Sequence, residues 1–249
     1  MKKILILTLA IVAAIWWFKR PAPVIQPQVK PQVNPSPVDQ LETISYQNKT
    51  YRFSYFTVDD LNRLKLIANS DFDSSESLIK KNQCLAATNG GFYDENDRPL
   101  GWLVSEGQEL SAPIISRLLD GFLATNGQAL IDFTQSKAPV RSAVQSGPML
   151  VYKKEPLKLN IANDELRRRA VALIVQDGQL IFLTIVGQDS ELAGPYLADL
   201  PGLAVAIGEK IAWQISEAIN LDGGTASAFF TDKVYLKELN PVGSIFCYN

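Results

Sequence analysis

Four short polar elements hold the residues whose types and spacing are best suited to chemistry. In chain order they contain Asn89-Gly90-Gly91, Ser146-Gly147-Pro148, Arg168-Arg169 and Asp222-Gly223-Gly224-Thr225, and each ends or begins an apparent strand. Glycine pairs let the backbone approach a ligand closely and expose N–H groups that bind anions. Arginine adds a planar fork that suits phosphate or carboxylate. Asn and Asp beside glycine can contact sugar hydroxyls or act at a reacting carbon.

Each element alone also has a plainer interpretation. Asn-Gly-Gly and Asp-Gly-Gly are common turn sequences, and the alternative for Asp222 is a turn aspartate that caps its own loop. A run of arginines is most often a solvated face. The functional information therefore lies in the four elements taken together and in their order.

The chain contains no histidine and only two cysteines. The absence of histidine excludes Ser-His-Asp and Cys-His catalysis and HExxH zinc sites. Acid–base chemistry must then come from Asp, Glu, Lys, Tyr or solvent. Two cysteines do not suffice for a cysteine-based structural zinc site, and no EF-hand-like spacing is present. We expect that no cofactor is required. A divalent cation is compatible with the sequence, but no motif in it indicates a metal site.

In their order along the chain, the four elements resemble the motifs of the phosphodiester glycosidase family. The resemblance spans residues 45–232 and is carried by Asn89–Tyr93, Ser146–Val151, Arg168–Ala172 and Asn220–Ser227. The chain departs from the family pattern at Arg169, where threonine is usual, and at Ala172, where glycine is usual. At positions 225–227, Thr-Ala-Ser replaces Gly-Ser-Ser.

The resemblance implies cleavage of a sugar-1-phosphodiester into a free sugar and a phosphomonoester. A phosphodiester anion is a weakly basic leaving group, so one carboxylate suffices where ordinary glycoside cleavage typically uses two. We assign Asp222 to the anomeric carbon, as general base or nucleophile, and Arg168 to the phosphate. Substrate contacts are expected from the other residues of the four elements: Asn89, Gly90, Gly91, Ser146, Gly147, Arg169, Gly223, Gly224 and Thr225.

Two other functions fit the same residues. A non-catalytic carbohydrate or cell-wall binding module on a membrane-tethered stalk would keep the pocket without turnover. A structural envelope protein with a docking partner would leave Asn89, Arg168 and Asp222 far apart. If these three residues lie close together, the structural envelope protein is disfavoured relative to the hydrolase and the binding module.

The elements that must position these residues are mostly strands. Alternating and β-branched patterns predict strands at Tyr51–Val58, 63–69 and 85–88, and a short helix at Ser74–Asn82 capped by Ser74 or Ser75. Turn signals predict three hairpins, which pair 101–105 with 108–110, 119–125 with 128–133, and 171–176 with 179–186. The best helical material lies at 190–217. The predicted class is α+β with a dominant antiparallel sheet and a few helices.

A hydrophobic segment precedes this domain. Ile4–Phe18 is mostly apolar and lies between lysines, which favours an N-terminal membrane anchor helix within residues 1–20, although it is shorter than the ~20 residues that a spanning helix uses. A cleaved signal peptide, with a cleavage site near Val12-Ala13-Ala14, and a buried core helix are the alternatives. Residues 21–39 contain six prolines and are expected to form a semi-rigid linker. Residues 40–249 would be the phosphodiester glycosidase-like domain.

Charge and cysteine content bear on location and partners. Residues 1–39 hold five of the 24 basic and one of the 26 acidic side chains, which leaves 19 and 25, or a net charge of −6, on residues 40–249. Such a domain lacks the basic footprint of a nucleic-acid binder. We expect export to the cell envelope, either anchored in the inner membrane through residues 4–18 or secreted after cleavage. Cys84 and Cys247 would then form a disulfide, with two unpaired thiols as the alternative.

Overall fold

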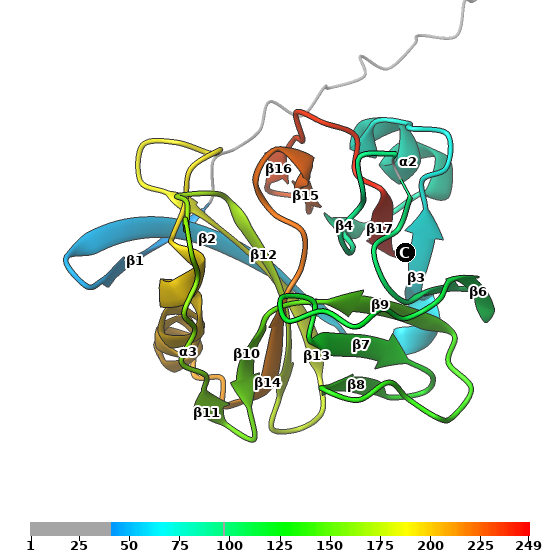
Figure 1. Cartoon of the computed structure of the whole chain (residues 1–249). Helices are drawn as coiled ribbons and strands as arrows, with labels where there is room; N and C mark the ends of the chain where they lie inside the picture. The colour runs from blue at the N-terminus through cyan, green and yellow to red at the C-terminus, as the bar shows by residue number, and fades with distance from the viewer. Residues whose placement is uncertain (1–40, 97) are drawn as a thin grey trace, which may run out of the picture. The chain divides into compact units, whose positions relative to one another are not determined.

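The computed structural model describes residues 41–249, with residue 97 excepted. The predicted anchor and linker lie outside the described residues. Within them the chain forms three sheets and two α-helices, and every paired strand is antiparallel to its neighbour (Figure 1). The predicted α+β class with a dominant antiparallel sheet is confirmed for this part of the chain. No helix within it is long and apolar enough to cross a membrane.

The largest sheet has seven strands and forms the middle layer. Its order is β1 (Glu42–Tyr46), β2 (Lys49–Val58), β13 (Leu180–Gly187), β12 (Arg169–Val175), β14 (Ile215–Asn220), β10 (Met149–Tyr152) and β11 (Glu155–Pro156). The central strands β12 and β13 are apolar along nearly their whole length because both of their faces are covered. Leu173 and Leu183 pack with helix α3 (Leu200–Lys210), whereas Ala172 and Phe182 join a core shared with the other two sheets.

The second sheet carries the first glycine motif. Its order is β16 (Tyr235–Leu236), β15 (Phe229–Phe230), β4 (Ala86–Asn89), β17 (Ser244–Tyr248) and β3 (Leu64–Ala68). Helix α2 (Ser75–Asn82) leads into β4, and the Ser74 hydroxyl caps it by accepting a hydrogen bond from the Ser77 N–H at 3.3 Å. Cys84 and Cys247 form the predicted disulfide, with Cα atoms 5.3 Å apart. It ties the segment after α2 to the neighbouring strand β17.

The third sheet carries the second glycine motif. Its order is β6 (Gln108–Ser111), β5 (Leu103–Ser105), β9 (Ser142–Ser146), β7 (Gly121–Thr125) and β8 (Ala129–Asp132). The pairs β5–β6 and β7–β8, together with β12–β13 in the first sheet, are the three predicted hairpins. Each hairpin forms where a glycine with positive φ follows a polar residue in the turn: Gly107, Gly127 and Gly178.

The segment 190–217 is only partly helical. Helix α3 covers Leu200–Lys210, with Pro201 in its first turn, and it ends before Ala212, whose φ of +59° cannot continue a helix. The chain then enters β14 at Ile215 and pairs with both β12 and β10. The expectation of helix beyond Lys210 was wrong, because partners distant in the sequence set the conformation there.

Candidate active site

The ends of β4 and β14 meet, although they belong to different sheets. Asn89 ends β4 and is 1% exposed, and its side-chain amide donates a hydrogen bond to the backbone carbonyl of Asp222 at 2.8 Å. The Asp222 N–H donates in turn to the Gly90 carbonyl at 3.2 Å. The Asn89 Oδ1 accepts from the Ala228 N–H, also at 3.2 Å. The first and fourth polar elements are therefore bound to each other.

Gly90 and Gly91 are required by packing between strands. A Cβ on Gly90 would lie 2.2 Å from the Ser244 Oγ in β17, and one on Gly91 would lie 2.4 Å from a methyl carbon of Val144 in β9. Neither position tolerates a side chain without displacement of its neighbour. The close approach that these glycines permit is thus to neighbouring strands, and their contact with a ligand stays a prediction.

The end of β9 is joined to the end of β14. The Ser146 hydroxyl donates to the Asn220 carbonyl at 2.7 Å, and the Asn220 amide donates to the Gly147 carbonyl at 2.8 Å. The Gly147–Pro148 peptide bond is cis. The second polar element therefore lies beside the residues that precede Asp222. The Ser146 hydroxyl is fully buried and is engaged with backbone.

Arg168 lies directly before β12 and contacts the fourth element through its backbone. The Gly224 N–H donates to the Arg168 carbonyl at 2.9 Å, and a Cβ on Gly223 would lie 2.7 Å from that same oxygen. The Arg168 side chain is 1% exposed, and its Nη2 donates to the Lys237 carbonyl at 2.9 Å. All four predicted elements thus converge, and the reading in which Asn89, Arg168 and Asp222 lie far apart loses its basis.

The Arg168 guanidinium keeps two buried donors without a partner. Among the described residues, no acceptor bonds its Nε or its Nη1. Burial lowers the pKa of Arg168, and the charges of Glu191 and Glu238 oppose that shift. Buried polar atoms in folded proteins are nearly always hydrogen-bonded, and an unpaired buried donor costs about 1–3 kcal/mol. The two unpartnered nitrogens on this buried cation have the chemistry to bind an anion.

Asp222 is a half-buried carboxyl whose pKa lies near 7. Burial raises its pKa from 3.8 to about 7, and the hydrogen bond that its Oδ1 accepts from the Gly223 N–H at 2.8 Å opposes that shift. The bond to Gly223 is the local loop contact expected of a turn aspartate. It does not account for the desolvation that raises the pKa of the carboxyl. A desolvated carboxyl with a pKa near 7 is typical of general acid–base catalysis.

Tyr93 was not among the predicted site residues, although it ends the first motif. Its ring covers Gly243, where an added Cβ would lie 1.7 Å from a ring carbon, and its hydroxyl donates to the Gly243 carbonyl. The pKa of Tyr93 is raised to about 12, first by burial and also by the charge of Asp222, with the Ser244 hydroxyl opposing. The phenol therefore stays protonated near the candidate carboxylate.

Two predicted contacts are engaged with protein instead. The Arg169 Nε donates to the Pro195 carbonyl at 3.0 Å, and its Nη2 donates to the Glu165 carbonyl at 2.6 Å and pairs with Asp164 at 3.4 Å. These contacts explain why Arg169 is buried and give it a role in holding loops. The Thr225 hydroxyl accepts from the Asn240 amide at 3.0 Å. A direct contact of either side chain with substrate stays a prediction that these bonds do not support.

A neighbouring arginine lies nearer to the fourth element than Arg169 does. Gly224 has a φ of +69°, and a Cβ there would lie 3.2 Å from the Arg167 Nη1. Arg167 is exposed and pairs with Glu165. Its place in the arginine run was visible in the sequence, but which of three consecutive arginines approaches the glycines was not.

Unpartnered polar atoms are concentrated in this region. Seven buried side-chain atoms of the described residues lack a hydrogen-bond partner, and four of them belong to the third and fourth elements: Arg168 Nε and Nη1, Asn220 Oδ1 and Ser227 Oγ. Ser227 is one of the family's usual hydroxyls that this chain keeps. Within the described part of the chain, no three His, Cys, Asp or Glu side chains are arranged to hold a metal ion.

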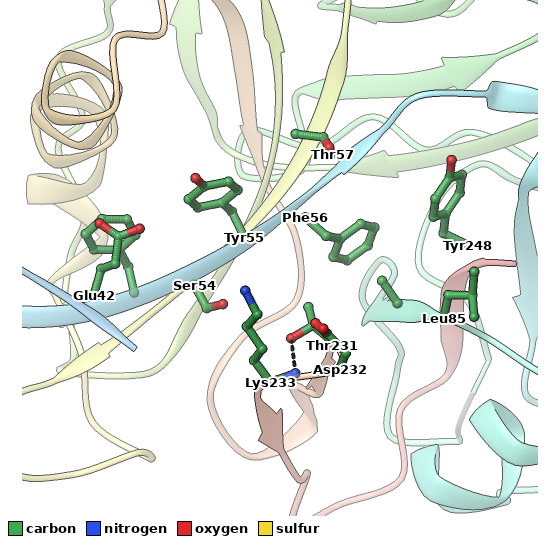
Figure 2. Close-up of a pocket in the computed structure, with 12 residues that line it drawn as sticks. Glu42, Ser54, Tyr55, Phe56, Thr57, Leu85, Thr231, Asp232, Lys233 and Tyr248 are labelled. Carbon is green, nitrogen blue, oxygen red and sulfur yellow. Dashed lines mark hydrogen bonds between the residues drawn. The ribbon is translucent and has the colours of Figure 1, made fainter. Parts of the chain in front are cut away.

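A prominent cavity of the described chain lies elsewhere. It has a volume of about 640 Å³ and lies where β2, the start of β4 and the turn between β15 and β16 meet. Figure 2 shows Phe56, Tyr248 and Lys233 around it. None of the predicted site residues lines this cavity. This cavity is therefore separate from the region of Asp222 and Arg168.

Comparisons with known proteins agree with the fold and the motif order. The family model for phosphodiester glycosidases matches residues 82–246. The catalytic domain of zebrafish N-acetylglucosamine-1-phosphodiester alpha-N-acetylglucosaminidase, solved auto-inhibited by its pro-peptide, is similar with a TM-score of 0.65 and 17% identity, over 84% of this chain and 81% of that chain.

Two further solved structures share the fold. A hypothetical protein from Synechocystis has a TM-score of 0.61 and 13% identity, over 83% of this chain and 61% of that chain. A putative exported protein from Burkholderia pseudomallei has a TM-score of 0.56 and 12% identity, over 80% of this chain and 74% of that chain. No curated protein matches the sequence.

Proposed function

Because this chain belongs to the phosphodiester glycosidase family, we propose that it is an exported hydrolase that cleaves sugar-1-phosphodiesters in the cell envelope. The observation that carries the proposal is the pair of unpartnered donors on the buried Arg168, held by backbone contacts against the loop of Asp222. Phosphate presents oxygens in the geometry that a guanidinium fork binds. The two residues then supply the anion site and the acid–base group that the reaction needs.

The proposed reaction breaks the bond between the anomeric carbon and the phosphate oxygen. Arg168 binds the phosphate and stabilises the charge that it gains as the leaving group. In the direct form, Asp222 accepts a proton from water as the water oxygen bonds to the anomeric carbon, and the bonding electrons leave with the phosphomonoester. In the covalent form, the Asp222 carboxylate bonds to the anomeric carbon first and water then releases the sugar.

Export is supported by two observations of different kinds. The apolar segment Ile4–Phe18 is typical of an anchor or a signal. The disulfide between Cys84 and Cys247 is the kind of bond that persists in oxidising compartments outside the cytoplasm. Anchoring in the inner membrane and cleavage of the segment are both compatible with these observations, and fractionation of cells that produce the full chain would separate them.

Isotope labelling tests the proposed reaction. The full chain is incubated in H₂¹⁸O with the methyl diester of N-acetylglucosamine-1-phosphate, and with the glucose analogue. We expect free reducing sugar with ¹⁸O at its anomeric carbon and unlabelled methyl phosphate. Asp222→Asn should release no sugar, whereas Asp232→Asn, in an exposed turn of the second sheet, should match the unmodified protein.

Three outcomes contradict the proposal. Label in the phosphate would indicate attack at phosphorus and a phosphodiesterase. Full activity of Asp222→Asn would remove this carboxyl from the mechanism. Binding of the diesters without release of sugar from any of them would favour the non-catalytic carbohydrate-binding module.

A further inference from the structure

Exposed apolar side chains gather around the candidate site. Eleven large apolar side chains of the described residues are exposed, and six of them lie on loops that contact Gly147, Arg168 or Thr225. We call these six the apolar rim: Ile114, Ile115, Leu118, Leu166, Leu192 and Leu239. Single exposed apolar residues are normal on a protein surface, but a group at one site marks an interaction surface.

Half of the rim lies on the loop between β6 and β7. This loop packs directly against the second polar element, since a Cβ on Gly147 would lie 2.2 Å from the Leu118 carbonyl oxygen. Ile115 has a relative exposure of 106%, so its side chain contacts almost no other part of the described chain. Ile114 and Leu118 are also more than 40% exposed. The loop thus presents three apolar side chains beside the site.

The outward position of these side chains is built into the loop. Gln145, which is 2% exposed, accepts a hydrogen bond from the Ile114 N–H at 2.9 Å and donates to the Ile114 and Leu119 carbonyls, both at 2.8 Å. The Ser116 hydroxyl accepts from the N–H groups of Leu118 and Leu119. The backbone on both sides of Ile115 is therefore fixed. The side chain cannot turn inward without loss of these bonds.

The other half of the rim lies beside the arginine element. The Leu192 carbonyl accepts a hydrogen bond from the Arg168 N–H at 2.9 Å, and the Leu239 N–H donates to the Thr225 carbonyl at 2.8 Å. Leu166 is two residues before Arg168. Leu239 is 63% exposed. Three apolar side chains of the rim thus come from the β6–β7 loop, and the other three come from the loops around Arg168.

We propose that the apolar rim docks on a lipid bilayer and holds the site at the level of the headgroups. The inference rests on the proposed function, and it makes the substrate class a sugar-1-phosphodiester carried on a membrane lipid. The exposed Arg117 lies between Ile115 and Leu118. Arg167 follows Leu166 and pairs with the exposed Glu165, and the exposed Glu191 precedes Leu192, so the charges beside the arginine element balance. Exposed apolar side chains beside a cation, as Ile115 and Leu118 are beside Arg117, are typical of surfaces that bind a membrane interface.

A lipid surface fits the rest of the chain better than a protein partner does. Residues 40–249 carry a net charge of −6, whereas the part of the rim on the β6–β7 loop carries the exposed cation Arg117. The apolar segment Ile4–Phe18 is expected to reach a bilayer, and the 22 positions from residue 19 to residue 40 would span about 60 Å at ~3 Å per residue when extended. That length allows any face of the domain to touch the same membrane.

Fluorescence of an added tryptophan tests the docking. The full chain is reconstituted in vesicles of phosphatidylcholine and phosphatidylglycerol that contain spin-labelled phosphatidylcholine. The test variant is Ile115→Trp, and the matched control is Leu130→Trp, an exposed apolar position (41%) in β8 outside the rim. Both variants keep the four natural tryptophans, whose emission is subtracted with the unmodified protein. We expect a blue shift and quenching by the spin label for Ile115→Trp and neither change for Leu130→Trp.

Equal emission and equal quenching of the two variants would overturn the proposal. A blue shift of Ile115→Trp that depends on protein concentration and ignores the spin label would also overturn it, in favour of contact between two copies of the chain. The readout needs no turnover. Quenching at Ile115→Trp without sugar release would support membrane docking and contradict the proposed hydrolase function. Sugar release without quenching would support the hydrolase function and contradict membrane docking.

Discussion

The Asn89 side-chain amide donates a hydrogen bond to the backbone carbonyl of Asp222 at 2.8 Å, across 133 positions of sequence. Asn89 also accepts the Ala228 N–H, so one buried side chain links the end of β4 to both sides of the Asp222 loop. The carboxyl that we assign to the anomeric carbon is therefore held from a different sheet than the one that carries it. The asparagine of the first motif acts in this structure as a positioning residue.

Removal of the Asn89 amide should loosen the Asp222 loop. Asn89→Ala leaves the Asp222 carbonyl and the Ala228 N–H without these partners in a buried region, at a cost of about 1–3 kcal/mol in unfolding free energy. Sugar release should fall by a larger factor than stability alone explains. The control is Asn82→Ala, which removes a hydrogen bond to the Leu78 carbonyl at 2.8 Å within α2. Equal activity of the two variants would contradict the positioning role.

Asp222→Asn should abolish turnover and change the pH dependence of stability. The raised pKa, about 7 against 3.8, means that the folded protein keeps a proton that the unfolded chain releases between those values. Stability from this group is therefore present at low pH and is lost as the pH rises toward 7, by at most about 1.4 kcal/mol per pH unit. Urea unfolding of both proteins should be measured from pH 5 to 8. The free energy of unfolding of the unmodified protein should fall relative to that of the variant as the pH rises, and the difference between the two should become constant above pH 7.

The pH profile of kcat/KM should report the same carboxyl. A general base or nucleophile works in its charged form, so kcat/KM should rise about tenfold per pH unit below pH 7 and then level off. Tyr93, with a pKa of about 12, stays protonated throughout and should add no inflection in this range. A profile that falls through pH 7 would instead assign Asp222 as a general acid.

Inorganic phosphate should bind at Arg168 and stabilise the protein. The unpartnered Nε and Nη1 donors would gain an acceptor, so the Tm should rise with phosphate concentration. Arg168→Met should abolish that dependence while it keeps or raises stability without phosphate, because a buried charge is removed. Arg98→Met, which removes an exposed pair with Asp94, is the control and should retain the phosphate effect. A phosphate effect that survives in Arg168→Met would place the anion elsewhere.

Reduction of the disulfide should weaken the site from a distance. Cys84 and Cys247 close a loop with a sequence separation of 163, for which chain entropy gives about 3–5 kcal/mol of stabilisation. Cys84 lies just before β4, and β4 ends at Asn89. Cys84→Ser with Cys247→Ser should therefore lower the Tm and reduce activity together. Unchanged activity at temperatures well below the new Tm would show that β4 holds Asn89 without the bond.

Local chemistry made several parts of this protein readable from sequence. The three hairpins follow from short turns that contain glycine between alternating strands, and the cap of α2 follows from Ser74 ahead of an apolar pattern. The order of the four polar elements predicted that they form one site, and their mutual hydrogen bonds confirm that they converge. The prediction of helix beyond Lys210 was wrong, because β14 pairs with strands that are distant in the sequence.

The sequence by itself determined which residue types are available: one conspicuous aspartate beside a glycine pair, an arginine run, and no histidine. Only the tertiary structure decided which members of the run matter. Successive side chains of an extended segment point to opposite sides, so Arg168 and Arg169 cannot face the same surroundings. Arg169 meets carbonyl acceptors and Asp164, whereas Arg168 keeps two buried donors open. That difference depends on which layer covers each side of β12, and the layers come from segments far apart in the chain.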